Sequence, residues 1–109
     1  MQNLFVNFLE ICDRESHIRH IRGCVDPVEF NADPSRPSLM EISPNRCRIQ
    51  FRYYTACVEL ERINVFSRYF PDAVITFVFH SEDERIEGCY RYEGGRCVWG
   101  NASGQDPLP

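Results

Sequence analysis

The sequence predicts an α+β domain, in which two helices pack on one face of an antiparallel sheet. Apolar and arginine-rich positions alternate over residues 46–55, as they do in a strand with one buried face. Apolar residues then recur at three- and four-residue steps within 55–70, and Pro71 ends this amphipathic helix. Gly94 and Gly95 separate two strand-like segments, which predicts a hairpin with a two-residue turn.

The first half of the chain is expected to supply a strand, a helix and a second strand. Within residues 3–12, apolar side chains occupy both odd and even positions, so both faces of a strand would be apolar, which favours a strand in the centre of the sheet. A short helix should follow over 14–22, and Gly23 is placed as the residue that ends it. The proline-rich stretch 26–38 predicts a loop before a brief strand at 39–42.

The last third of the chain is expected to add three more strands. Residues 73–80 alternate between large apolar inward positions and smaller or polar outward ones. Segments 85–93 and 96–99 form the hairpin, and in the predicted register Tyr90 faces Trp99. Two strand–helix units followed by a strand and a hairpin give the split β-α-β arrangement, with both helices on one side of the sheet.

Length and charge restrict the functional classes. The 109 residues suit a single domain, which we expect over 1–99, followed by a disordered tail over 100–109. No apolar run approaches the roughly 18–20 residues of a membrane span, and no secretory signal is legible, which indicates a cytoplasmic protein. The net charge is −4, and all 12 basic residues are arginines without a basic block. This pattern argues against direct binding to nucleic acid or to a membrane, and favours a protein partner with a basic surface.

The cysteines occur singly, without a C-x-x-C pair or the spacing of a zinc site. In a cytoplasmic chain we expect them to be reduced and to behave as small apolar residues, often buried in the core. Three disulfides are the alternative. The residues concerned are Cys12, Cys24, Cys47, Cys57, Cys89 and Cys97.

The first helix carries the one metal-like arrangement in the sequence. His17, His20 and Cys24 have the spacing that brings ligands for a soft metal to one helix face. Because Gly23 is expected to end the helix, Cys24 should turn away, and solvent-facing histidines are the favoured interpretation. We therefore predict no metal and no other cofactor. A small cysteine- or metal-dependent enzyme or sensor built on these residues is the alternative function.

The favoured binding surface is the outward face of the strand at 46–55, extended by the hairpin. Its arginine and tyrosine side chains are of the types that most often become interface hot spots. A ladder of cross-strand charge pairs on a wet face is the alternative interpretation. An acidic turn is the second candidate surface, and a solvated loop is the alternative there. The candidate partner-binding residues are Arg46, Arg48, Arg52, Tyr54 and Arg91, with Glu82, Asp83 and Glu84 in the turn.

The second half of the chain resembles a known family. The Phe-Pro-Asp that closes the helix at 70–72, the aromatic strand 75–79 and the run Gly-Cys-Tyr-Arg-Tyr-Glu-Gly-Gly at 88–95 are similar to the YubB-type ferredoxin-like domain. The Phe-Asn and proline within 30–34 resemble the segment after the first helix of that family. The resemblance implies a ferredoxin-like antiparallel sheet without an iron–sulfur cluster, and it carries over no catalytic residue.

A small, acidic, non-enzymatic protein-binding module is the function that these observations favour. The resemblance implies an origin in a plasmid, phage or other mobile element. It also implies a bacterial inhibitor of a host defence protein, of the anti-CRISPR or anti-restriction kind. The expected partner is a host protein, such as a subunit of a nuclease complex. An open sheet face would also fit a second copy of the chain, so a homodimer is the other expected assembly.

Overall fold

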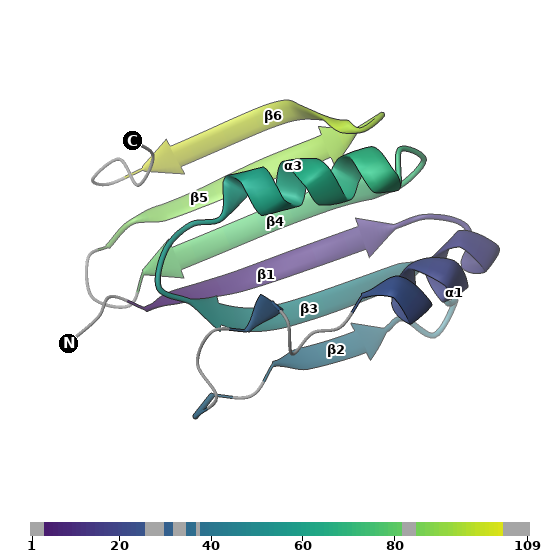
Figure 1. Ribbon diagram of the computed structural model, residues 1–109, viewed down its shortest axis with the longest axis horizontal. Helices are drawn as coiled ribbons and strands as arrows, with labels where there is room; N and C mark the ends of the chain where they lie inside the picture. The colour runs from purple at the N-terminus through teal and green to yellow at the C-terminus, as the bar shows by residue number, and fades with distance from the viewer. Residues whose placement is uncertain (1–3, 26–29, 32–34, 37, 82–84, 104–109) are drawn as a thin grey trace.

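The computed structural model describes residues 4–25, 30–31, 35–36, 38–81 and 85–103. In chain order the elements are β1 (Phe5–Cys12), α1 (Glu15–Cys24), β2 (Leu39–Ile42), β3 (Arg48–Thr55), α3 (Leu60–Tyr69), β4 (Val74–Ser81), β5 (Glu87–Glu93) and β6 (Arg96–Ser103). The strands form one 6-stranded sheet in the order β2-β3-β1-β4-β5-β6, and every neighbouring pair is antiparallel (Figure 1).

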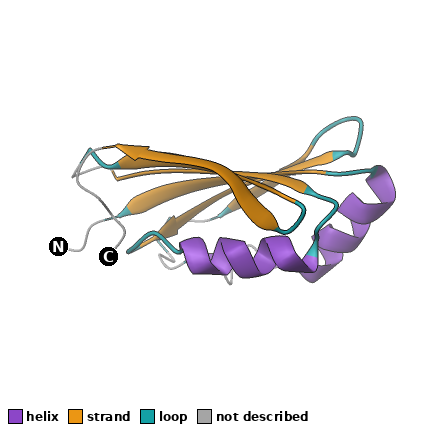
Figure 2. Cartoon of the chain, turned by 90° about the horizontal axis from the view of Figure 1, so that it is seen from above, coloured by secondary structure: helices purple, strands orange, loops and turns teal. Residues whose placement is uncertain are grey.

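Two helical connections organise the sheet around β1. The chain passes from β1 through α1 into β2, which runs parallel to β1 with β3 between them. It then passes from β3 through α3 into β4, and here β1 lies between the two parallel strands. Both helices lie on the same face of the sheet (Figure 2). The predicted α+β class and the central first strand are therefore confirmed, while most of the loop predicted at 26–38 lies outside the described residues.

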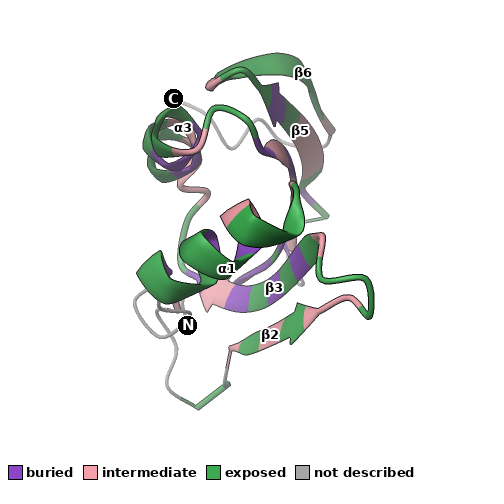
Figure 3. Cartoon of the chain, turned by 90° about the vertical axis from the view of Figure 1, so that its right-hand side faces the viewer, coloured by how far each residue is buried: buried purple, intermediate pink, exposed green. Residues whose placement is uncertain are grey.

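The core lies between the helices and the inner face of the sheet. Alternate residues of β1, β3 and β4 point to this side, so buried and exposed positions alternate along β3 (Figure 3). Ile18 and Ile21 of α1 and Ile63 of α3 pack on these positions from the helix side. The almost completely buried strand residues are Leu9, Ile11, Ile49, Ile75, Phe77 and Phe79.

The first helix extends past the residue that was expected to end it. It runs through Cys24, so the prediction that Gly23 ends it is wrong. Val25 follows as the C-cap residue: its backbone is extended, and its N–H donates to the Ile21 carbonyl at 3.0 Å. Val25 is buried in the core, and the helix extends two residues beyond its predicted end. Gly23 therefore has ordinary helical geometry, and a Cβ added there would meet nothing within 4 Å.

Replacing Gly23 by alanine should stabilise the protein by about 0.5–1 kcal/mol. Alanine loses less backbone freedom than glycine when the helix forms, and the new methyl group enters open space. Urea unfolding of the two proteins measures the difference. Gly88→Ala is the matched control, because its added Cβ would lie 2.5 Å from the Phe79 ring. A loss of stability in Gly23→Ala would contradict the extent of α1.

Other boundaries differ from those predicted. β3 begins at Arg48, because residues 43–47 form a hydrogen-bonded turn. α3 begins at Leu60 and not near residue 55 as predicted, because β3 extends through Thr55 and residues 56–59 connect it to the helix. β6 continues through Ser103 and pairs with β5 over this length. The first part of the tail predicted at 100–109 is therefore a strand, and the remainder lies outside the described residues.

The β5–β6 hairpin has the predicted turn and, next to it, the predicted pairs Tyr92–Cys97 and Glu93–Arg96, but its register differs from the prediction beyond Tyr92. Gly94 and Gly95 have φ of 63° and 79°, as a two-residue turn of the I′ type requires. A β-bulge next to Arg91 shifts the pairing, so Trp99 faces Arg91 instead of Tyr90. Because a shift by one residue moves a side chain to the other face, Trp99 joins the open face, where it is 52% exposed.

Candidate functional site

The open face of the sheet, opposite the helices, presents two rows of side chains that each cross all six strands. Within a row, every residue is the cross-strand partner of the next one. The central row consists of Leu39, Arg52, Phe8, Val78, Cys89 and Asn101. The polar row consists of Glu41, Gln50, Glu10, Thr76, Arg91 and Trp99. The central row holds exposed apolar side chains, of which Phe8 is 42%, Leu39 44% and Val78 37% accessible.

Charges along the polar row are paired with neighbours on the same face. The Gln50 side-chain amide donates to the Glu10 carboxylate at 3.1 Å, and the Arg48 guanidinium lies 3.9 Å from that carboxylate. The Arg91 guanidinium donates to Glu93 at 3.0 Å. Exposed pairs of this kind contribute about 0–1 kcal/mol, so the groups remain available to a partner.

Arg52 is an unpaired charge at the centre of the open face. Its cross-strand neighbours are Leu39 and Phe8, and in the described part of the chain its guanidinium forms no ion pair. A planar guanidinium between apolar side chains is the arrangement of an interface anchor. A shallow hollow of about 330 Å³ lies over this part of the sheet. A second hollow of about 260 Å³ shares Val78 and reaches Trp99, so the two extend across most of the face.

Four of the residues predicted to bind a partner lie on this face. Arg48, Arg52 and Tyr54 alternate along β3 with buried residues. Arg91 lies on β5 and points to the same side. β1 and β4 separate β3 from β5, so Arg91 lies about 14 Å from the β3 group at ordinary strand spacing. The four predicted binding residues are therefore spread across the open face and do not form a single cluster.

The other predicted binding residues do not join them. Arg46 has a φ of 60°, lies in the turn between β2 and β3, and lines a different hollow next to α1. Its predicted place on the outward face of the strand is therefore wrong, because the turn interrupts the strand pattern before Arg48. The acidic turn of Glu82, Asp83 and Glu84 lies outside the described residues.

Sequence reasoning missed the apolar centre of the open face. Phe8, Leu39, Val78 and Trp99 are all exposed there, and none of them was a predicted site residue. The signal was present in the first strand, where apolar residues occupy both parities. In a sheet that helices cover on one face only, outward-facing apolar residues on the central strand indicate an uncovered patch.

His17, His20 and Cys24 of α1 do not come together as one group, because His17 pairs with Asp13 and His20 pairs with Cys24. His17 Nδ1 lies 3.0 Å from the Asp13 carboxylate, whereas His20 Nε2 lies 3.8 Å from Cys24 Sγ. Among the residues that the structure describes, no group of three or more histidines, cysteines or carboxylates is placed to hold a metal ion. The geometry therefore gives no support to a metal centre on this helix.

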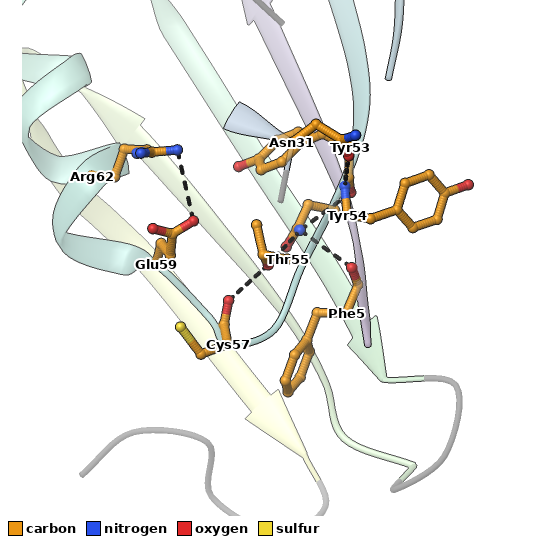
Figure 4. A network of polar contacts seen from close by, with 9 residues as sticks. Phe5, Asn31, Tyr53, Tyr54, Thr55, Cys57, Glu59 and Arg62 are labelled. Atoms are coloured by element: carbon orange, nitrogen blue, oxygen red, sulfur yellow. Dashed lines mark hydrogen bonds and ion pairs between the residues drawn. The ribbon is translucent and has the colours of Figure 1, made fainter. Parts of the chain in front are cut away.

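A buried polar network connects β1 to the segment between β3 and α3 (Figure 4). The Asn7 side-chain amide donates to Thr55 Oγ1 at 2.9 Å and to the Tyr53 carbonyl at 3.2 Å. The Thr55 hydroxyl in turn donates to the Cys57 carbonyl at 2.7 Å. Burial, reinforced by Glu59, raises the pKa of Tyr53, which keeps the phenol protonated at neutral pH. These groups satisfy one another, so the network fixes the chain and leaves no free base.

All the cysteines are free thiols, and none of them is fully buried. The expectation that they are core residues is therefore wrong. Cys12 lies at the end of β1, with its Sγ 3.7 Å from a Glu10 carboxylate oxygen. Burial and this carboxylate raise the pKa of the Cys12 thiol, which makes it a poor nucleophile at neutral pH. The exposed cysteines are Cys24, Cys57 and Cys97.

Fold and surface together define a small α+β protein whose open sheet face has an apolar centre and charged surroundings. None of the helices within the described residues has the length and apolar character needed to cross a membrane. Comparisons with protein-family models, with curated proteins and with solved structures found no match. The function is therefore inferred from the geometry of the molecule itself.

Proposed function

We propose that this chain is a non-enzymatic protein-binding module that docks a partner protein on the open face of its sheet. The central row carries the proposal, because Arg52, which has no ion-pair partner among the described residues, lies between the exposed Leu39 and Phe8. Protein interfaces typically have an apolar centre with aromatic and arginine anchors, surrounded by a polar rim. Here the paired charges of Glu10 and Arg91 supply such a rim on the adjoining row.

We further propose that the sheet is ferredoxin-like, with the β5–β6 hairpin added at one edge. The order β2-β3-β1-β4 and the two helical connections between parallel strands support this assignment. Membership of the YubB-type family, and a role as an inhibitor of a bacterial host's defence protein, are narrower proposals. Their support is the resemblance of residues 70–72, 75–79 and 88–95.

Removing the side chains at the centre of the open face should weaken binding of the partner. We expect the double variant Phe8→Ser/Arg52→Ser to bind about 30-fold more weakly, because each hot-spot side chain contributes about 1 kcal/mol or more. A pull-down from a bacterial lysate first identifies a stoichiometric partner of the wild-type chain. Titration calorimetry with that purified partner then gives the Kd of each variant.

Tyr69→Ser is the matched control for this experiment. Tyr69 lies on α3, on the other side of the sheet, and is 76% exposed. Its removal deletes a comparable aromatic surface and should leave the Kd unchanged. The proposal fails if no stoichiometric partner is recovered, or if the double variant retains the partner while folded by circular dichroism. Sedimentation of the wild-type chain at rising concentration distinguishes a second copy from a different protein.

A further inference from the structure

A groove separate from the open face lies between α1 and the edge strand β2. Its volume is about 650 Å³. It lies on the helix side of the sheet, because Met40 and Ile42 pair with the buried residues of β3. Figure 3 shows α1 above β3, with β2 beyond it at the edge of the sheet. Met40 and Ile42, over the buried Ile18, form its apolar floor, and the charged residues around it are Arg19, Arg22, Arg46 and Glu15.

Positive charge gathers in this groove although the chain as a whole carries −4. Arg19 is paired with Glu15 across one helical turn at 3.1 Å, so these two charges offset each other. Arg22 and Arg46 form no ion pair in the described part of the chain. Two uncompensated guanidinium groups therefore line a groove with an apolar floor, which is complementary to a ligand that carries both carboxylates and apolar groups.

Arg46 is held at the end of the groove by a turn that arginine does not favour. Its φ of 60° lies in the left-handed region, which costs a residue with a side chain about 1–2 kcal/mol. Two backbone hydrogen bonds hold the turn, from the Arg46 N–H to the Ser43 carbonyl at 2.9 Å and from the Ser43 N–H to the Arg48 carbonyl at 3.0 Å. Asparagine or glycine would fit this backbone better, so the arginine occupies this position at a cost in stability.

β2 offers backbone groups to the same groove. It is the terminal strand of the sheet, and within the described residues only β3 pairs with it. Alternate N–H and C=O groups on its outer side therefore have no strand partner in the described part of the chain. An exposed sheet edge is a template to which an extended peptide adds as a further strand.

We propose that the groove between α1 and β2 binds an extended acidic segment of a partner protein. The segment pairs with the outer edge of β2 and directs alternate side chains into the groove. An apolar side chain contacts the floor at Met40 and Ile42, and carboxylates on either side of it reach Arg22 and Arg46. This site is distinct from the open face, so it extends the proposed function to a second contact.

A fluorescence-anisotropy titration tests the proposal with a labelled synthetic peptide. Every second residue of the peptide is serine, and the residues between the serines are glutamate, valine and glutamate in that order. Two companion peptides carry glutamine or lysine in place of both glutamates. We expect the glutamate peptide alone to bind, and Arg22→Gln and Arg46→Asn each to weaken it about tenfold. Amide hydrogen exchange should slow at alternate residues of β2 when the peptide binds.

Arg46→Gly separates binding from stability, because it removes the charge and relieves the left-handed backbone. Its free energy of unfolding should rise while its affinity for the peptide falls. Arg68→Gln on α3 and Arg96→Gln at the start of β6 are the matched controls, since they make the same charge change outside both proposed surfaces and should alter the affinity less than about twofold. Equal loss in these controls would overturn the proposal, as would equal binding of the glutamine peptide. Competition by inorganic phosphate at the peptide's own concentration would also overturn it, in favour of a small anion.

Discussion

The Phe79→Ala variant is expected to lose about 3–5 kcal/mol of unfolding free energy. Phe79 is completely buried at the junction of β1, β4 and β5. Its ring meets Phe5 edge-on at a centroid distance of 6.1 Å and stacks on Tyr90 at 6.1 Å. Small domains are stable by only about 5–15 kcal/mol, so this single cavity removes a large share of the total. Urea unfolding monitored by circular dichroism measures the loss.

A double-mutant cycle with Gly88 makes this prediction specific. In the wild-type background Gly88→Ala should cost about 1–3 kcal/mol, because its Cβ would lie 2.5 Å from the ring of Phe79, which is completely buried. In the Phe79→Ala background the same methyl group enters the cavity, and the change should be neutral or stabilising. Phe8→Ala, on the open face of the neighbouring strand, should cost much less. Additive losses for the pair would show that Phe79 and Gly88 are not in contact.

The elements that could be predicted are those in which one local pattern decides the outcome. The alternation through β3 requires one face inward, and Ile49 and Phe51 are buried as that pattern demands. The adjacent glycines at 94–95 can adopt the positive φ that a tight hairpin turn needs, so the turn was legible as well. The order of these elements then leads to the observed α+β class.

The boundaries that failed depend on contacts distant in the sequence. A glycine inside a helix costs only about 1 kcal/mol, which burial of Val25 in the core outweighs, so α1 continues past Gly23. The bulge next to Arg91 has no local signature, because Arg91 and Tyr92 both suit a strand. It places Tyr92 in the core beside α3 and Trp99 on the opposite face. Neither event is visible in a window of a few residues.

The two candidate sites differ in how much of each the sequence contains. Arg48, Arg52 and Tyr54 share a face because of strand alternation alone, so the open face could be located from the sequence. The groove beside α1 could not, because it requires Arg46 in a left-handed turn and Arg22 on a helix that is distant in sequence. A surface within one strand is local, whereas a groove between a helix and a sheet edge exists only after packing.

The second large effect expected is a loss of stability in alkali that arises from buried tyrosines. Burial, with smaller contributions from Cys97, Tyr90 and Glu61, raises the pKa of Tyr92 from 10.0 to about 12. Burial raises the pKa of Tyr53 as well. Above about pH 10 the unfolded chain loses these protons while the folded chain keeps them, so the unfolded state is favoured increasingly as the pH rises. The contribution of these two tyrosines to stability is complete below about pH 10 and falls by about 1.4 kcal/mol per pH unit for each of them above it.

The composition of the chain makes this titration unusually clean to measure. It contains no lysine, so no lysine ammonium group titrates in the same pH range as the two buried tyrosines. Urea unfolding at closely spaced pH values, in the presence of a reductant, gives the slope. Tyr92→Phe should reduce the slope by about half, and Tyr53→Phe/Tyr92→Phe should nearly abolish it. Tyr69→Phe, at an exposed site, should leave it unchanged. If the double variant keeps the wild-type slope, the alkaline loss arises from groups other than these two phenols.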